Sequence, residues 1–394
     1  MKNDYISMRW LLLLAVVLLL NACSDTDAPG DQKEEERVQL ELRPYVPSFL
    51  EVSPNQTRAF PGDYNFVSYA NLYDNFKTQQ SLVDATIHML YTKANVNGVT
   101  PDPAYEEGTF YKSGDVWRSL VKMDQDQLYL YGFIPDDVAN GGVNSVSPLD
   151  GDYANGITFT IHKMNSITPA DVCVTVAAGR GSETSPDEGF GVGKFGFKAK
   201  TEPDKNFVYL LFDHIYSSIC FSFKVKDTYN ELRTIKLKKL RLLNSEKKQY
   251  VDAHITLTAN TTSPLTSLSF SASKKTDDTE YMETAECLLF QANTDDELVT
   301  LDPKTASDFL GCFVQPDSYS NFILESTYDV YDKNVTTDAP DGNLVRKDCV
   351  AKNVIKVNAS LTRGNMMRLS LLVNPTYLYM LSEPDLDNPT VTLE

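Results

Sequence analysis

The chain of 394 residues is long for one domain and sufficient for two. Its 36 basic and 54 acidic residues give a formal net charge of −18, which argues against nucleic-acid binding and against electrostatic adhesion to anionic membranes. The 21 tyrosines and 19 phenylalanines favour pleated sheets over helices.

The first 22 residues have the features of a lipoprotein signal peptide. Lys2 and Arg9 supply positive charge, and the apolar run at 11–20 is too short to span a bilayer. The run ends in Leu-Asn-Ala-Cys, an apolar residue, any residue, a small residue and then a cysteine. The alternative is an ordinary signal peptide with an unrelated cysteine nearby. We expect Cys23 to carry a lipid, because no folded segment precedes it.

Residues 23–58 are expected to form a lipidated leash and then a strand. Residues 24–36 are polar and acidic, so they cannot bury enough surface to fold. Acidic residues directly after the cysteine resemble the surface-export signal of some Gram-negative lipoproteins, which predicts a surface-exposed location on the outer membrane. Val38, Leu40 and Leu42 then alternate with polar residues, as in a half-buried strand.

Alternation with a period of two dominates the rest of the chain and predicts an all-β protein. In the run 234–243 the apolar phase shifts between Leu237 and Leu240, which predicts a β-bulge. The best short helix candidate is 303–311. Because each strand has one apolar face, each sheet needs a second sheet over it, as in a β-sandwich. Other predicted strands lie at 127–135, 217–226 and 353–361.

A stretch rich in Gly, Ser and charge at 177–196 indicates a break between two sandwiches. We place the boundary between Lys200 and Asn206, so the expected domains are 59–200 and 201–394. The first strand of the second sandwich is then 207–212.

The sequence shows no catalytic constellation, and we expect neither an enzyme nor a cofactor. Gly191, Gly193 and Gly196 match GxGxxG, but the flanks lack the strand and helix of a dinucleotide site. The histidines lie too far apart for a local metal motif, so no metal site is predicted. His214 follows Asp213, and neighbours in a strand face opposite sides, so this pair forms no relay by itself. The other histidines are His88, His162 and His254.

Five cysteines follow Cys23, and their odd number and wide spacing argue against a complete disulfide framework. Cys220 and Cys287 lie in strand-like runs and are expected to be small core residues. A single bridge between Cys312 and Cys349 is left open.

Several stretches resemble the fimbrillin family, the subunits of type V pili on Gram-negative outer membranes. The most specific is the ending LLVNPTYLYMLSEPDLDNPTVTLE, from Leu371 onward. TPADVCVTVAAGRG, WRSLVKMDQDQLYLYGFIP and FDHIYSSICFSFKV support it. With the lipobox, these stretches span nearly the whole chain.

The resemblance implies two tandem transthyretin-like β-sandwich domains and export as a lipoprotein. It also implies cleavage after an arginine by an arginine-specific surface protease, which removes an N-terminal strand. The C-terminal tail of another subunit then fills the groove, so the expected partners are other fimbrial subunits. The expected removable strand is Val38, Leu40 and Leu42, and the candidate tail residues are Leu378, Met380, Val391 and Leu393.

We expect the cut between Arg58 and Ala59, in a polar segment with Pro and Gly nearby. Arg43 precedes a proline, which trypsin-like proteases disfavour, and a cut after Arg37 leaves the strand attached. The alternative is that Arg58 is an ordinary surface arginine. Stalk, tip and anchor roles stay open, although an Arg58 cut disfavours the anchor.

Two functions follow from these patterns. The first is a non-enzymatic fimbrial subunit that supports cell adhesion, anchored in the outer-membrane lipid through Cys23 until it is processed. The alternative is a monomeric lipoprotein that stays anchored at the surface and binds glycans or proteins. The N-terminus of the surface protein distinguishes them, because only the first exposes Ala59.

Overall fold

The computed structural model describes residues 39–47, 49–52, 85–95, 99, 104–119, 127–165, 169–199, 206–243, 250–274, 286–333, 343–376 and 385–393. This part of the chain is nearly all strand, which confirms the all-β expectation. No helix within these ranges is long and apolar enough to cross a membrane. Their helical turns are η1 (Asp136–Val138), α3 (Asp227–Asn230) and η3 (Asp295–Glu297).

An eight-stranded sheet encloses the first core. The last strand in its order, β9, also pairs with β6 near the other end, through Phe133 and Ile134 of β6. The sheet therefore closes on itself. The enclosed core includes Leu42, Phe110 and Leu210. In spatial order the strands are β10 (Gly196–Lys198), β6 (Gln127–Ile134), β3 (Ile87–Lys93), β4 (Tyr105–Ser113), β5 (Val116–Arg118), β1 (Glu41–Tyr45), β11 (Phe207–His214) and β9 (Cys173–Gly181).

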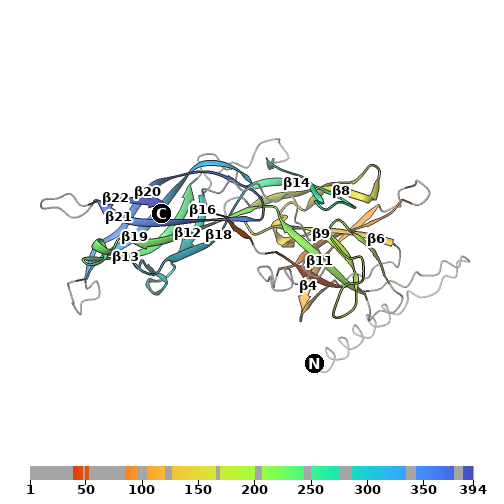
Figure 1. The fold of residues 1–394 in the computed structure, drawn as a ribbon, viewed down its shortest axis with the longest axis horizontal. Helices are drawn as coiled ribbons and strands as arrows, with labels where there is room; N and C mark the ends of the chain where they lie inside the picture. The colour runs from red at the N-terminus through yellow and green to blue at the C-terminus, as the bar shows by residue number, and fades with distance from the viewer. Residues whose placement is uncertain are drawn as a thin grey trace, which may run out of the picture. The chain divides into compact units, whose positions relative to one another are not determined.

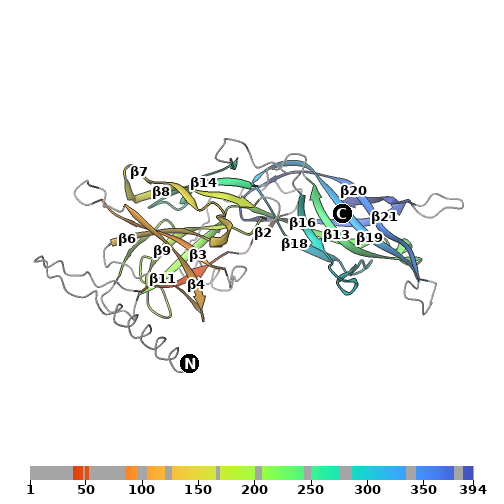
Figure 2. The same ribbon diagram turned by 180° about the vertical axis from the view of Figure 1, so that it is seen from behind.

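A four-stranded sheet packs against this one and completes what we call the first module. Its strand β14 lies beside β8, as the green and yellow ribbons show in Figure 1 and again from behind in Figure 2. Tyr131 and Phe133 of β6 share a core with Phe159 of β8 and Ile255 of β14. The strand order is β15 (Leu265–Ala272), β14 (Tyr250–Thr258), β8 (Asp152–Asn165) and β7 (Val143–Leu149).

These pairings correct the expected division near residue 200. The strand β11, expected to begin the second sandwich, pairs with β9 and β1 in the first module. β14 and β15 also belong to the first module, although they follow it in sequence. The Gly- and Ser-rich stretch begins within β9, and most of it is the loop between β9 and β10, which packs Phe190 and Phe195 inward. Its composition reflects a turn-rich loop and no change of sheet.

Two further sheets share one core and form the second module. Phe221 of β12 meets Phe322 of β19 across the layers, with ring centroids 6.4 Å apart. The β12 sheet contains β18 (Ser307–Val314), β12 (Ser217–Val225), β21 (Asn365–Thr376), β2 (Leu50–Val52) and β22 (Asp385–Leu393). The β13 sheet contains β16 (Glu286–Gln291), β13 (Arg233–Leu243), β19 (Asp317–Asp332), β20 (Leu344–Leu361) and β17 (Val299–Thr300).

The predicted bulge in β13 is confirmed. The register between β13 and β19 shifts between Leu237 and Lys239, and the apolar residues on both sides of the shift are buried. The predicted helix at 303–311 is wrong, because β18 begins at Ser307. Phe309 is buried and Leu310 is 61% exposed, which is the alternation of a strand. The transthyretin-like character of the modules stays a prediction.

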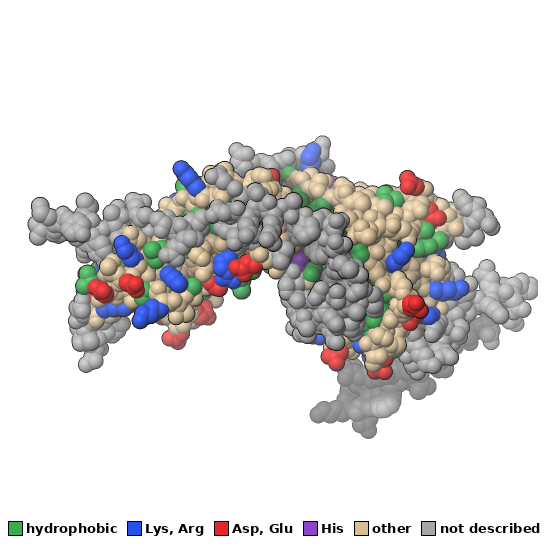
Figure 3. Space-filling model, viewed as in Figure 1, with side chains coloured by type: hydrophobic (Ala, Val, Ile, Leu, Met, Phe, Trp, Pro, Cys, Tyr) green, Lys and Arg blue, Asp and Glu red, His purple; other side chains and the backbone are tan. Residues whose placement is uncertain are grey.

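Charged residues of both signs are interspersed on the face seen in Figure 3, and hydrophobic side chains are scattered among them. Leu310 and Val354, both 61% exposed, are examples of outward-facing apolar residues. Isolated apolar residues of this kind are normal on a protein surface.

Candidate functional site

The N-terminal strand β1 lies inside the eight-stranded sheet, between β5 and β11. Leu42 pairs in parallel with Val208 of β11 and in antiparallel with Trp117 of β5. Leu40 and Leu42 are 1% and 0% exposed. Because full burial of one leucine contributes about 1.5–3 kcal/mol, these two side chains hold the segment in the core.

The structure therefore places two of the three predicted strand residues in the core. The strand itself begins later than expected, at Glu41, and extends to Tyr45. Arg43 points away from that core, with its guanidinium 5.0 Å from the ring centroid of Phe207. Val38 lies outside the described residues.

A second N-terminal strand, β2, belongs to the second module. It pairs in parallel with β21, where Glu51 lies opposite Met366. The carboxylate of Glu51 accepts a hydrogen bond from Arg368 Nε at 2.9 Å, and Arg368 also donates to Asp308 at 2.6 Å. A strand of three residues has too little alternation to be recognised in the sequence, and it was not predicted.

The strands β2 and β22 share one edge of β21. β12 pairs with residues 366–373 of β21 and occupies one edge. β2 pairs with residues 365–367 and β22 with residues 371–376, so both must lie on the other edge. The N-terminal segment and the C-terminal tail are thus neighbours along the same strand.

The connection between β1 and β2 contacts His214 at the end of β11. The ring Nε2 of His214 donates a hydrogen bond of 2.8 Å to the carbonyl oxygen of Pro47. Phe49 stacks on the same imidazole, with ring centroids 3.8 Å apart, and also on Phe313 at 5.7 Å. Residues 47 and 49 therefore cover His214.

His214 also belongs to a buried group with Asp171 and Cys173. Antiparallel pairing of β11 with β9 puts His214 directly opposite Cys173. Its Nδ1 lies 2.7 Å from Asp171 Oδ1 and 3.2 Å from Cys173 Sγ, and that sulfur lies 3.7 Å from the same carboxylate oxygen. All three residues are buried, with exposed fractions of 7%, 0% and 0% for Asp171, Cys173 and His214.

This group does not have the properties of a nucleophilic centre. Burial and the neighbouring Asp171 carboxylate raise the pKa of the Cys173 thiol well above its ordinary value. A thiol must ionise to attack a substrate, and reactive cysteines have lowered pKa values and some exposure. The group is instead a set of three metal-ligand residue types that converge.

The sequence missed this group because His214 lies 41 positions from Cys173 in the chain. Asp213, the neighbour of His214, pairs with Arg363 instead. The only available signal was the spacing of Asp171 and Cys173, which puts both side chains on one side of an extended chain. The partner His214 is identified only by the sheet register.

Most predicted processing residues lie outside the described part of the chain. These are Cys23, Arg58, Ala59, Leu378 and Met380. In the tail, Val391 and Leu393 belong to β22, where they lie opposite Val373 and Leu371 of the same chain. The tail thus pairs within its own chain in this structure.

The Cys312–Cys349 bridge does not form in this structure. The five cysteines from Cys173 to Cys349 are thiols. Cys312 instead has its sulfur 3.9 Å from that of Cys287, and both side chains lie in the core of the second module.

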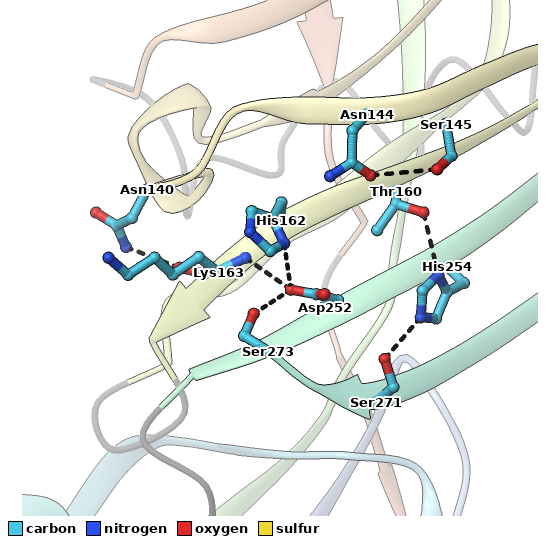
Figure 4. A network of polar contacts seen from close by, with 10 residues as sticks. All are labelled: Asn140, Asn144, Ser145, Thr160, His162, Lys163, Asp252, His254, Ser271 and Ser273. Carbon is cyan, nitrogen blue, oxygen red and sulfur yellow. Dashed lines mark hydrogen bonds and ion pairs between the residues drawn. The ribbon is translucent and has the colours of Figure 1, made fainter. Parts of the chain in front are cut away.

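A polar network lies on the four-stranded sheet (Figure 4). His162 Nδ1 lies 2.8 Å from Asp252 Oδ1, and His254 bonds to Thr160 at 3.0 Å and to Ser271 at 2.7 Å. His254 is exposed and hydrogen-bonded on both ring nitrogens, as expected for a histidine that borders a strand. We assign this network to the stability of the sheet.

Of the comparisons with known proteins, the one with solved structures found matches. No protein-family model matches the chain, and no curated protein matches it. A fimbrial protein from Bacteroides vulgatus is 13% identical with a TM-score of 0.42, over 90% of this chain and 97% of that one. A proposed cell adhesion protein from Bacteroides fragilis is 12% identical with a TM-score of 0.36, over 91% and 97%. Another from Bacteroides ovatus is 13% identical with a TM-score of 0.34, over 91% and 96%.

Proposed function

We propose that this protein is a structural subunit of a cell-surface fimbrium that supports adhesion and polymerises by strand exchange. The observation that carries the proposal is the position of β1 in the interior of a sheet, parallel to β11, with Leu40 and Leu42 in the core. A strand close to the N-terminus is removed by one cut downstream of it. Such a cut leaves β5 and β11 with unpaired backbone groups and an open apolar groove.

The position of β2 extends this proposal to the second module. A cut at Arg58 removes β2 together with β1, because both strands precede it in the chain. The edge of β21 beside residues 365–367 then loses its partner, and β22 pairs further along that same edge. We propose that β22 leaves this edge and enters the groove of another subunit. Before the cut, the lipid on Cys23 holds the precursor at the outer membrane.

Replacing Arg58 with Ala tests the processing step. We expect R58A to accumulate as lipidated precursor that starts at Cys23, whereas the wild-type surface protein starts at Ala59. The matched control is Arg37→Ala, which leaves the proposed cut intact and should mature normally. The N-terminal peptide, identified by mass spectrometry of surface-extracted protein, gives the answer. A normal N-terminus and normal polymer in R58A would contradict the proposed cut.

A chain that ends at Pro384 tests the role of the tail, because it lacks β22. We expect this chain to be processed at Arg58 but to stay monomeric when mixed only with itself, because no copy carries a strand to donate. Polymer length is measured on gels without boiling. Wild-type polymer from the shortened chain would exclude β22 as the donated strand.

A further inference from the structure

Three electron-rich atoms meet in the buried group of Asp171, Cys173 and His214. His214 Nε2 donates to the Pro47 carbonyl, so in a neutral imidazole Nδ1 carries a lone pair. That lone pair faces Asp171 Oδ1 at 2.7 Å and Cys173 Sγ at 3.2 Å. Buried lone pairs that face one another need a hydrogen or a metal ion between them.

We propose that Asp171, Cys173 and His214 bind a zinc ion. With a proton on Nδ1, the ring and the Cys173 thiol both donate to the Asp171 carboxylate, whereas a metal ion contacts all three atoms directly. Thiolate and imidazole together favour Zn²⁺ over Mg²⁺ and Ca²⁺, which prefer oxygen ligands. One thiolate and one carboxylate balance the charge of Zn²⁺, which suits a site without access to solvent.

The spacing of the three atoms is close to that of a zinc site. Bond lengths to zinc imply separations between ligand atoms of about 3.3–3.8 Å in a tetrahedral site. The sulfur of Cys173 lies 3.7 Å from Asp171 Oδ1, within this range. The 3.2 Å between Cys173 and His214 must lengthen slightly, and the 2.7 Å between His214 and Asp171 must lengthen more.

The surroundings of His214 match those of a metal ligand. Metal-bound histidines usually donate their second ring N–H to a carbonyl or carboxylate, which fixes the tautomer. Here that acceptor is Pro47, and the ring of Phe49 stacks on the imidazole. Both residues belong to the N-terminal segment that carries β1 and β2. Zinc binding to His214 therefore stabilises the packing of this segment against the end of β11. The proposal does not depend on fimbrial assembly.

The metal content of the full-length protein tests the proposal. The protein is produced with added zinc and purified without chelator, and zinc is measured by elemental mass spectrometry. We expect about one zinc per chain. Protein produced with cobalt should show a thiolate-to-cobalt charge-transfer band in the near ultraviolet. Background zinc and no such band in the wild type mean that a proton alone occupies the site, which overturns the proposal.

Variants identify the ligands. We expect Cys173→Ser to lose the cobalt band and, like Asp171→Asn, to lower the zinc content about tenfold or more. Cys220→Ser is the matched control, because it removes a buried thiol of β12 outside the group and should keep both signals. If C173S fails to fold, the cobalt spectrum of the wild type and the zinc content of D171N test the proposal instead. A band that persists in C173S, or unchanged zinc in D171N, overturns the assignment.

Discussion

The imidazole Nε2 of His214 donates a hydrogen bond of 2.8 Å to the carbonyl oxygen of Pro47, which lies 167 positions earlier in the sequence. This bond fixes the short connection between β1 and β2. Because β1 belongs to the first module and β2 to the second, one N-terminal segment completes a sheet in each. Removal of this segment is expected to open both sheets.

A substitution at Leu42 measures how much the packing of β1 in the core contributes to the stability of the protein. We expect Leu42→Ala to lower the free energy of unfolding by about 2–5 kcal/mol, because it leaves a cavity in the core. Leu310→Ala is the control, since Leu310 is 61% exposed and should change stability by less than about 0.5 kcal/mol. Urea unfolding of both variants is the measurement. Equal losses would contradict the core position of Leu42.

The ion pair of Arg363 and Asp213 is nearly buried, since the Asp213 side chain is only 7% exposed. Its contribution to stability can therefore be compared with that of an exposed pair. Arg363→Met should destabilise the protein by about 1–3 kcal/mol, because the carboxylate loses its cationic donor. In contrast, Arg180→Met should cost less than about 1 kcal/mol, because Arg180 and Asp187 are 34% and 44% exposed. Chemical unfolding at neutral pH compares the two. A larger loss in R180M than in R363M would refute this ranking.

Stability should fall in acid partly through Asp136. Hydrogen bonds from His88 and Thr109 lower the pKa of this carboxyl, and burial opposes them. A lowered pKa means that the unfolded chain takes up the proton first, at about pH 4. The contribution is therefore present above this pH and is lost as the pH falls through the folded pKa. Asp136→Asn should unfold with a shallower dependence on pH below 4, measured by thermal unfolding from pH 6 to 2.5. An unchanged slope would show that Asp136 does not contribute.

Cys287 and Cys312 should become linked under oxidising conditions, because their sulfurs are 3.9 Å apart. The two thiols lose their hydrogens to an added disulfide such as oxidised glutathione, which is reduced to two thiols. Peptide mapping without reductant should find the 287–312 crosslink, and Cys312→Ser should abolish it. Cys220→Ser is expected to have no effect. A crosslink that joins Cys349 to Cys312 would restore the pairing that the sequence left open.

Local alternation was the reliable part of the sequence. It correctly predicted the bulge between Leu237 and Leu240 and the inward-facing Leu40 and Leu42, because side chains in a strand alternate regardless of its partner. It failed at 303–311, where a short polar-apolar mixture fits a helix as well as a strand. The division near residue 200 was predicted from composition instead. Composition indicates where loops lie, but it does not indicate which strands pair.

The amino-acid sequence by itself determined the all-β class and the buried face of most strands, since both depend on residues that are neighbours in the chain. Only the tertiary structure decided that β11, β14 and β15 return to the first module and that β2 joins the second. It alone brought His214 opposite Cys173 and under Pro47. Strand order and register depend on backbone pairing between distant segments. Because every residue except proline offers the same backbone donor and acceptor, the sequence of one strand does not identify its partner.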